Sequence, residues 1–228
     1  MNLYCKYSMV VIFVIFSLLT NSQVDTSMFI RYTPEFRFTE GIYLNFEQVK
    51  NNNPVLKERL ETTADYNSLD FFVKVIEEKK IVYYDDRALK QEIETDKIWG
   101  YCRLGALFIR YNDDFNRIPI VGSIAHFVSE YALRYNNRYY DPYNSSRDPF
   151  YYDPYHGASS TQEMREYIIE FSTGNVMDFD RNSLKIILMK DTSLYDEFNN
   201  LSKRKQKKML FYYLRKFNER NPLLIPKE

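Results

Sequence analysis

The spacing of the apolar residues changes near residue 183, and this change limits the fold more than any other feature of the chain. Before it, apolar and polar residues alternate in short runs, as in residues 166–172 (EYIIEFS), with the two-residue period of a strand. After it, Leu184, Ile187 and Leu188 recur at helical spacing. Strands first and helices last predict an α+β fold, a mostly antiparallel β-sheet of about seven strands followed by C-terminal helices.

The clearest strand signal is a hairpin. Residues 98–102 (IWGYC) and 106–110 (ALFIR) flank the short glycine-containing connection RLG. Gly122 interrupts a later β-like run, which indicates a bulge or a close backbone approach. Residues 85–97 are polar and are expected to form a short helix or a loop. The other strand candidates are residues 41–46, 69–76, 81–84, 166–172 and 176–179, together with the long run that Gly122 interrupts, which consists of residues 118–121 and 124–131.

Three helices are expected after residue 182, forming the helical C-terminal part at 183–220. The first starts at residue 183 with Asp180 or Asn182 as its N-cap, and the second covers residues 193–199. The third, over residues 202–220, has the strongest pattern, and Asn-Pro at 221–222 ends it. Its apolar face consists of Leu210, Tyr213, Leu214 and Phe217.

The N-terminus has the pattern of a secretory signal. Lys6 precedes an apolar run at residues 9–19, and Thr20 and Ser22 are the small residues that favour cleavage before Gln23. We therefore expect residues 1–22 to be a signal peptide and residues 23–228 to form a single exported domain, periplasmic, outer-envelope or extracellular. An uncleaved anchor is the alternative, but a spanning helix needs about 20 apolar residues. No transmembrane segment is expected after cleavage.

The net charge bears on the kind of partner, and the aromatic content bears on the kind of secondary structure. The formal net charge is +0, so nothing in the overall charge favours nucleic acid as a partner. The chain has 21 Tyr and 17 Phe, and aromatic residues at this density favour strands and half-buried faces.

Few residues suit catalysis or metal binding. Cys102 and His126 are candidates for a thiol–imidazole pair, although buried structural roles explain both more simply. The beginning of a calcium-loop pattern, D-x-D-x-N, occurs at Asp178, Asp180 and Asn182. The glycine and glutamate that the pattern requires later are replaced by Ser183 and Met189. A helix cap explains the same residues. The adjacent acids at 85–86 and 113–114 are expected to form polar turns. We assign no catalytic residue, metal or cofactor.

Residues 136–161 contain the string YYDPY twice and Asp-Pro three times. The aromatic content argues against plain disorder, and a connection of this length is often functional. Tyrosine offers a large contact area at little cost in rotamer entropy. One interpretation is a binding loop, and the other is a set of rings that covers an edge of the sheet. The predicted binding residues are Tyr139, Tyr140, Tyr143, Tyr151, Tyr152 and Tyr155.

Basic residues dominate the last predicted helix. Eight of the nineteen residues from 202 to 220 are Lys or Arg, beginning with KRKQKK. This composition is typical of a helix that touches an anionic surface, and it also fits a solvated face. A peripheral envelope contact through residues 203–220 is therefore one expectation.

Four stretches resemble a group of exported bacterial proteins with a signal peptide, a β-rich middle, a helical end and no assigned activity. These stretches are GIYLNFEQVKNNNP, IWGYC with its hairpin, STGNVMDFDRNSLKIIL and YYLRKFNERNPL. The resemblance implies a bacterial, exported protein and assigns no functional residue.

Together these observations favour a non-catalytic binding or envelope-interaction module that uses the tyrosine-rich loop. Its expected partner is a protein, peptide or glycan of the cell envelope. Two alternatives stay open. One is a hydrolase that acts on an envelope polymer through carboxylates or Cys102 with His126, and the other is a structural subunit of a larger assembly.

Overall fold

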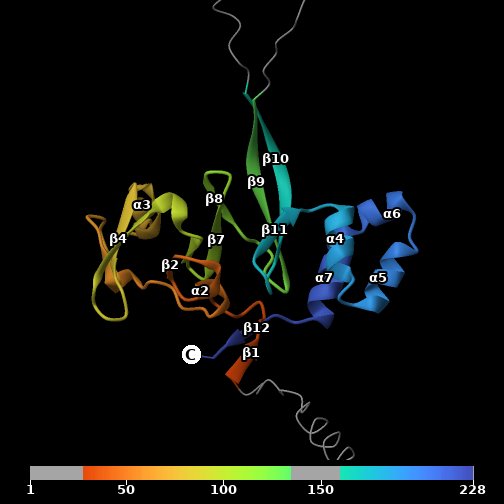
Figure 1. The fold of residues 1–228 in the computed structure, drawn as a ribbon, viewed down its shortest axis with the longest axis horizontal. Helices are drawn as coiled ribbons and strands as arrows, with labels where there is room; N and C mark the ends of the chain where they lie inside the picture. The colour runs from red at the N-terminus through yellow and green to blue at the C-terminus, as the bar shows by residue number, and fades with distance from the viewer. Residues whose placement is uncertain (1–27, 135–159, 228) are drawn as a thin grey trace, which may run out of the picture.

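The computed structural model describes residues 28–134 and 160–227. Over these residues the chain forms twelve strands, all paired antiparallel, and six α-helices, four of them at the C-terminal end. The α+β prediction is confirmed, with more strands than the seven expected. Figure 1 shows the order of the layers: a small sheet with one helix, two central sheets, and then the helices α4 to α7.

The first central sheet has the strand order β2-β6-β7-β8. The predicted hairpin is confirmed as β6 and β7, and its two turn residues, Leu104 and Gly105, both have positive φ, at 52° and 72°. Asn112 and Asp113 repeat this turn between β7 and β8, and such turns suit the twist of the flanking strands. The acids at 113–114 are therefore a turn residue and the start of a strand. The strands are β2 (Gly41–Tyr43), β6 (Gly100–Arg103), β7 (Ala106–Tyr111) and β8 (Asp114–Arg117).

The small sheet, β3-β4-β5, lies on one flank with helix α3. Here two predictions were wrong. Residues 69–76 were expected as a strand but contain most of helix α3, because Phe71, Phe72 and Val75 fall on one helical side and are buried together. Residues 85–97 include an edge strand, whose backbone pairing with β4 outweighs its charged sequence. The elements are β3 (Leu60–Glu61), α3 (Phe71–Glu77), β4 (Lys80–Tyr84), β5 (Lys90–Glu94) and the 3₁₀ turns Lys57–Arg59 and Thr95–Lys97.

The second central sheet has the order β11-β10-β9. Strands β9 (Ile124–Arg134) and β10 (Ser160–Glu170) pair over eleven residues each, longer than predicted, and β11 (Asn175–Asp178) pairs back as expected. Residues 118–121 form no strand, and only Ile120 bridges to this sheet. A Cβ atom on Gly122 would lie 2.5 Å from the Asn218 side chain, so the expected close approach is confirmed.

Helices α4 (Arg181–Leu188), α5 (Thr192–Asn199), α6 (Lys203–Lys208) and α7 (Leu210–Arg220) cover the other flank. Asp180 caps α4, as predicted, by accepting a hydrogen bond from the Ser183 N–H at 2.8 Å. The single helix expected over 202–220 was wrong, since it breaks at Met209. The buried Gln206 side chain donates a hydrogen bond to the Phe198 carbonyl, which ties α6 to the end of α5.

Two short segments far apart in the chain complete the fold. Strand β1 (Phe29–Arg31) pairs with β12 (Leu224–Pro226), and both lie beneath the central sheets in Figure 1. Helix α2 (Phe46–Lys50) follows β2, with Asn45 as its N-cap. The strand β12 was not predicted, because three residues carry too little pattern.

Three hydrophobic clusters fill the spaces between the layers. The middle cluster lies between the two central sheets and includes Cys102, Phe127 and Ile225. A second cluster joins the outer face of β9 and β10 to the helices, and a third joins α3 and the small sheet to the first central sheet. Because side chains alternate along a strand, Phe127 faces the middle cluster and Ile124 faces the helices.

Candidate functional site

The longest regular feature is the β9–β10 hairpin, called the arm below. It leaves the body of the molecule in Figure 1, and Met164, on the outer part of the arm, is 63% exposed. Arg134 pairs with Ser160, so the chain enters and leaves the segment between them at one end of the arm.

The six predicted binding tyrosines, Tyr139, Tyr140, Tyr143, Tyr151, Tyr152 and Tyr155, belong to that segment. Residues 135–159 lie outside the described part of the chain, and so do the predicted signal residues 1–22. Between residues 28 and 227, apart from that gap, no helix is long and apolar enough to cross a membrane.

The candidate thiol, Cys102, is part of the core. Its side chain is 0% exposed, and its Sγ donates a hydrogen bond to the Phe38 carbonyl at 3.4 Å. Burial raises the pKa of the Cys102 thiol to about 12. A thiol in this setting is a weak nucleophile because the thiolate is the reactive form.

His126 lies on the opposite side of the arm, where its ring packs against Phe179 and Phe211 with centroids 5.1 and 4.9 Å away. It is 4% exposed, and neither ring nitrogen has a hydrogen-bond partner among the described residues. The nearest charge is the Glu166 carboxylate, 3.8 Å from Nε2. Burial lowers the pKa of His126, and Glu166 opposes that shift only in part. The structure therefore does not bring His126 and Cys102 together.

The predicted carboxylate pairs serve turns. Asp85 accepts hydrogen bonds from the N–H groups of Leu89 and Arg87, and the bond from Leu89 is the main reason that its pKa is lowered. Asp113 and Asp114 border an open hollow of about 650 Å³ beside α3. A second open hollow, of about 660 Å³ on the outer face of the arm, contains Glu163, Glu166 and Asp178. The sequence offers no pattern that marks this second group, because strand pairing alone assembles it.

A more enclosed pocket of about 430 Å³ lies where β1, β12, the base of the arm and the helices meet. Sequence reasoning missed it because its walls come from distant segments. Its lining is mainly apolar, with Phe29, Phe171, Ile187, Phe217 and Leu224 among the side chains, and Ser123, Lys190 and Glu170 add polar groups. Pockets of this size and character hold small ligands in many proteins.

The polar groups of this pocket are already engaged with one another. Lys190 pairs with Glu170, and although burial opposes ionisation of Glu170, hydrogen bonds from Lys190 and Thr173 lower its pKa. The Ser123 hydroxyl donates to the Asn221 carbonyl at 2.6 Å. The acceptor of the Ser123 hydroxyl is thus a backbone carbonyl and not the general base that would activate a serine nucleophile.

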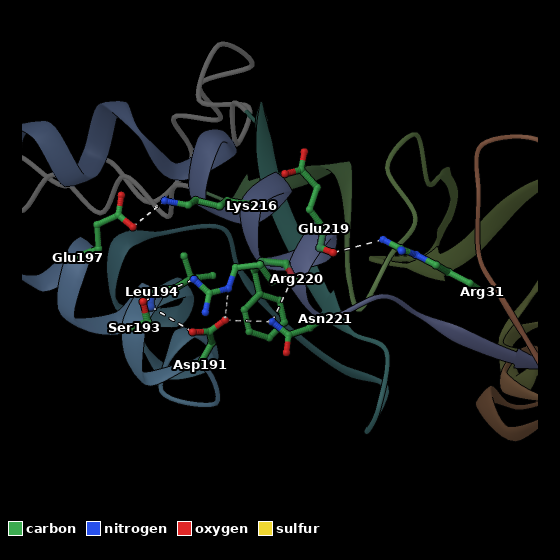
Figure 2. Close-up of polar contacts among 10 residues, drawn as sticks. Arg31, Asp191, Ser193, Leu194, Glu197, Lys216, Glu219, Arg220 and Asn221 are labelled. Atoms are coloured by element: carbon green, nitrogen blue, oxygen red, sulfur yellow. Dashed lines mark hydrogen bonds and ion pairs between the residues drawn. The ribbon is translucent and has the colours of Figure 1, made fainter. Parts of the chain in front are cut away.

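Charged residues also hold the helices to each other. Figure 2 shows Arg220 reaching Asp191 at 2.8 Å and Lys216 reaching Glu197 at 2.6 Å. Asp191 accepts a hydrogen bond from the Leu194 N–H as well, at 3.2 Å, so one carboxylate caps α5 and binds α7. These two cations of the predicted basic helix are thus neutralised within the flank.

Other cations of that helix have no such partner. Six basic residues of α6 and α7 are exposed, and none forms an ion pair or a side-chain hydrogen bond with another described residue. They are Lys203, Arg204, Lys205, Lys207, Lys208 and Arg215, and they are called the basic patch below.

Metal ligands do not gather in the described part of the chain, where no three His, Cys, Asp or Glu side chains are placed to hold a metal ion. Asp180, from the calcium-like motif, acts as a helix cap. A scan against protein-family models, a search of curated proteins and a search of solved structures found no match to this chain.

Proposed function

We propose that this protein is a non-catalytic binding module of the bacterial cell envelope, exported through its N-terminal signal. Its contact segment is the tyrosine-rich connection at 136–161. The observation that carries the proposal is the arm: eleven residues of β9 paired with eleven of β10, directed away from the body of the molecule (Figure 1).

Two physical arguments support this function. Phe127 and Ile168 pack the base of the arm into two different cores, and strand pairing continues to Arg134 and Ser160, so the ends of the tyrosine-rich segment are held near each other. Preorganisation of this kind lowers the entropy cost of binding. The buried Cys102 and its separation from His126 argue against the thiol hydrolase.

The test uses residues 23–228, which include every described element. Binding to isolated bacterial envelopes is measured by co-sedimentation, and chymotrypsin cleavage within 139–155 is mapped by mass spectrometry with and without envelopes. We expect envelopes to protect this segment. We also expect the joint replacement of Tyr140, Tyr143, Tyr152 and Tyr155 by Ser to weaken envelope binding at least tenfold, since aromatic anchors contribute about 2 kcal/mol or more at binding hot spots.

Two control variants sharpen the result. Tyr66→Ser with Tyr84→Ser removes exposed tyrosines far from the arm and is expected to leave binding unchanged. Cys102→Ala with His126→Phe removes the thiol and the imidazole and is expected to leave binding unchanged as well. The proposal fails if the fourfold serine variant, folded as judged by circular dichroism, binds envelopes as the unmodified chain does.

A further inference from the structure

The charge of this chain is strongly segregated although its total is zero. Residues 181–220 contain 11 Lys and Arg against 4 Asp and Glu, a net charge of +7. The described residues ahead of them, 28–134 and 160–180, contain 16 basic and 22 acidic residues, a net charge of −6. A neutral chain can therefore present a strongly positive face, and local potential rather than total charge decides what that face attracts.

Within the positive region the basic patch stands out, because its charges have no ion-pair or hydrogen-bond partner among residues 28–134 and 160–227. Five of its six residues crowd into the six-residue helix α6. Lys203 and Lys207 are four residues apart, as are Arg204 and Lys208, and like charges at this spacing repel across the helix surface. Lys203 and Arg204 also occupy the first turn, where the helix dipole favours acids.

The helix dipole favours Lys205, Lys207 and Lys208 in the last turn, but the repulsion within α6 and the two cations of its first turn oppose the arrangement, and no described residue supplies a counter-charge. Such a conflict between local preference and structure is typical of functional sites. The buried Gln206, on the opposite side of α6, anchors the helix through its bond to the Phe198 carbonyl, so the five cations point outward from a fixed base.

We propose that the basic patch is a docking surface for an anionic lipid bilayer. A bilayer fits better than an anionic polymer chain for two reasons. None of the three hollows described above is lined by a residue of α6, and α6 lies at the outer edge of the helical flank (Figure 1). In addition, Phe211 and Tyr212, just beyond α6, are 36% and 48% exposed, and aromatic rings suit the head-group region.

The test measures binding of residues 23–228 to vesicles of phosphatidylcholine with and without phosphatidylglycerol. At about 0.1 M salt, where charges act over about 10 Å, we expect binding to the anionic vesicles only, and loss of that binding at high salt. Each Lys or Arg near an anionic surface strengthens binding about fivefold. Joint replacement of Arg204, Lys207 and Arg215 by Gln should therefore weaken binding on the order of 100-fold.

A matched control removes the same charge elsewhere. Lys79, Arg87 and Arg117 are exposed residues of the other layers, and their joint replacement by Gln also removes one Lys and two Arg. We expect this control to bind anionic vesicles nearly as well as the unmodified chain. Equal weakening in both variants would show that net charge, not the patch, sets the binding.

Three further outcomes would overturn the proposal. The first is no binding to anionic vesicles, which would make the patch a solvated face. The second is equal binding to phosphatidylcholine alone. The third is binding to soluble heparin without any binding to vesicles. If the triple Gln variant loses that heparin binding, the patch belongs to an anionic polymer. These results do not depend on the tyrosines, so they are independent of the envelope-binding proposal above.

Discussion

The α3 flank and the helical flank of the molecule have similar apolar cores but differ in how their surface charges are paired. Each covers one side of the central sheets with a compact apolar cluster, nine buried residues around α3 and eleven around α4 to α7. The surface of the α3 flank, residues 57–97, has 8 basic and 11 acidic residues, and many of them pair, as Lys90 does with Glu61 at 2.7 Å. In the helical flank Lys190, Lys216 and Arg220 form ion pairs, whereas the basic patch forms none with the described residues.

This difference distinguishes charges that form ion pairs within the protein from charges that remain available to an external partner. Cross-strand pairs of opposite charge support the small sheet itself. The pairs Lys216–Glu197 and Arg220–Asp191 do the same between helices (Figure 2). The patch residues have no such role, which is why we assign them to an external surface.

The largest expected effect comes from truncating one core ring in each flank. Phe198→Ala and Phe72→Ala remove buried side chains, and each should lower the free energy of unfolding by about 3–5 kcal/mol. Denaturant titration measures that loss, and native-state hydrogen exchange locates it. If the flanks are separate units, exchange speeds up mainly within the altered flank. Uniform acceleration in both variants would show instead that the flanks unfold together.

The next largest effect is a pH dependence of the free energy of unfolding that arises from His126, beside the helical flank. His126 packs on Phe211 of α7 with a lowered pKa, so the unfolded chain binds the proton more readily than the folded one. Its contribution to stability is complete above the unfolded pKa of about 6.5 and is lost as pH falls below that value. The slope is at most about 1.4 kcal/mol for each pH unit. Glu166 is the charged group nearest the ring.

The variant His126→Phe tests this dependence. It removes two buried nitrogens without partners, so we expect the free energy of unfolding to rise by about 1–3 kcal/mol near pH 7. We also expect a flatter stability curve between about pH 5 and 6.5, above the range in which carboxylates titrate. Urea titrations across this range measure both. A variant that loses stability with acid as steeply as the unmodified chain would place the sensitive group elsewhere.

The smallest expected effect comes from removing one charge from each surface, the small sheet and the basic patch. The change in the free energy of unfolding should have opposite signs at the two sites. Lys90→Gln breaks the pair with Glu61 in the small sheet and should lower the free energy of unfolding slightly, because both side chains are about half exposed. Lys207→Gln relieves repulsion from Lys203 and should raise the free energy of unfolding by about 0.2–0.5 kcal/mol. Thermal unfolding at low salt resolves the difference, which should shrink in high salt. Destabilisation by Lys207→Gln would reveal a structural role for the patch.

The sequence by itself determined the features that depend on interactions between residues close together in the chain. The Leu104–Gly105 hairpin, the Asp180 cap and the helix end before Pro222 follow from backbone sterics and from hydrogen bonds within a few residues. The order of strands and helices follows from apolar periodicity, so the fold class could be predicted.

Only the tertiary structure decided the features that depend on distant partners. Residues 71–77 became a helix because burial of one side outweighed β-propensity. The predicted long helix is interrupted at Met209, where φ is −105° and ψ is 11°, and Gln206 of the first half bonds the distant Phe198 carbonyl. The same reason separates Lys216 from Lys207. Both are lysines of one basic stretch, but the fold places Glu197 beside the first and no acid beside the second, and no local pattern encodes that choice.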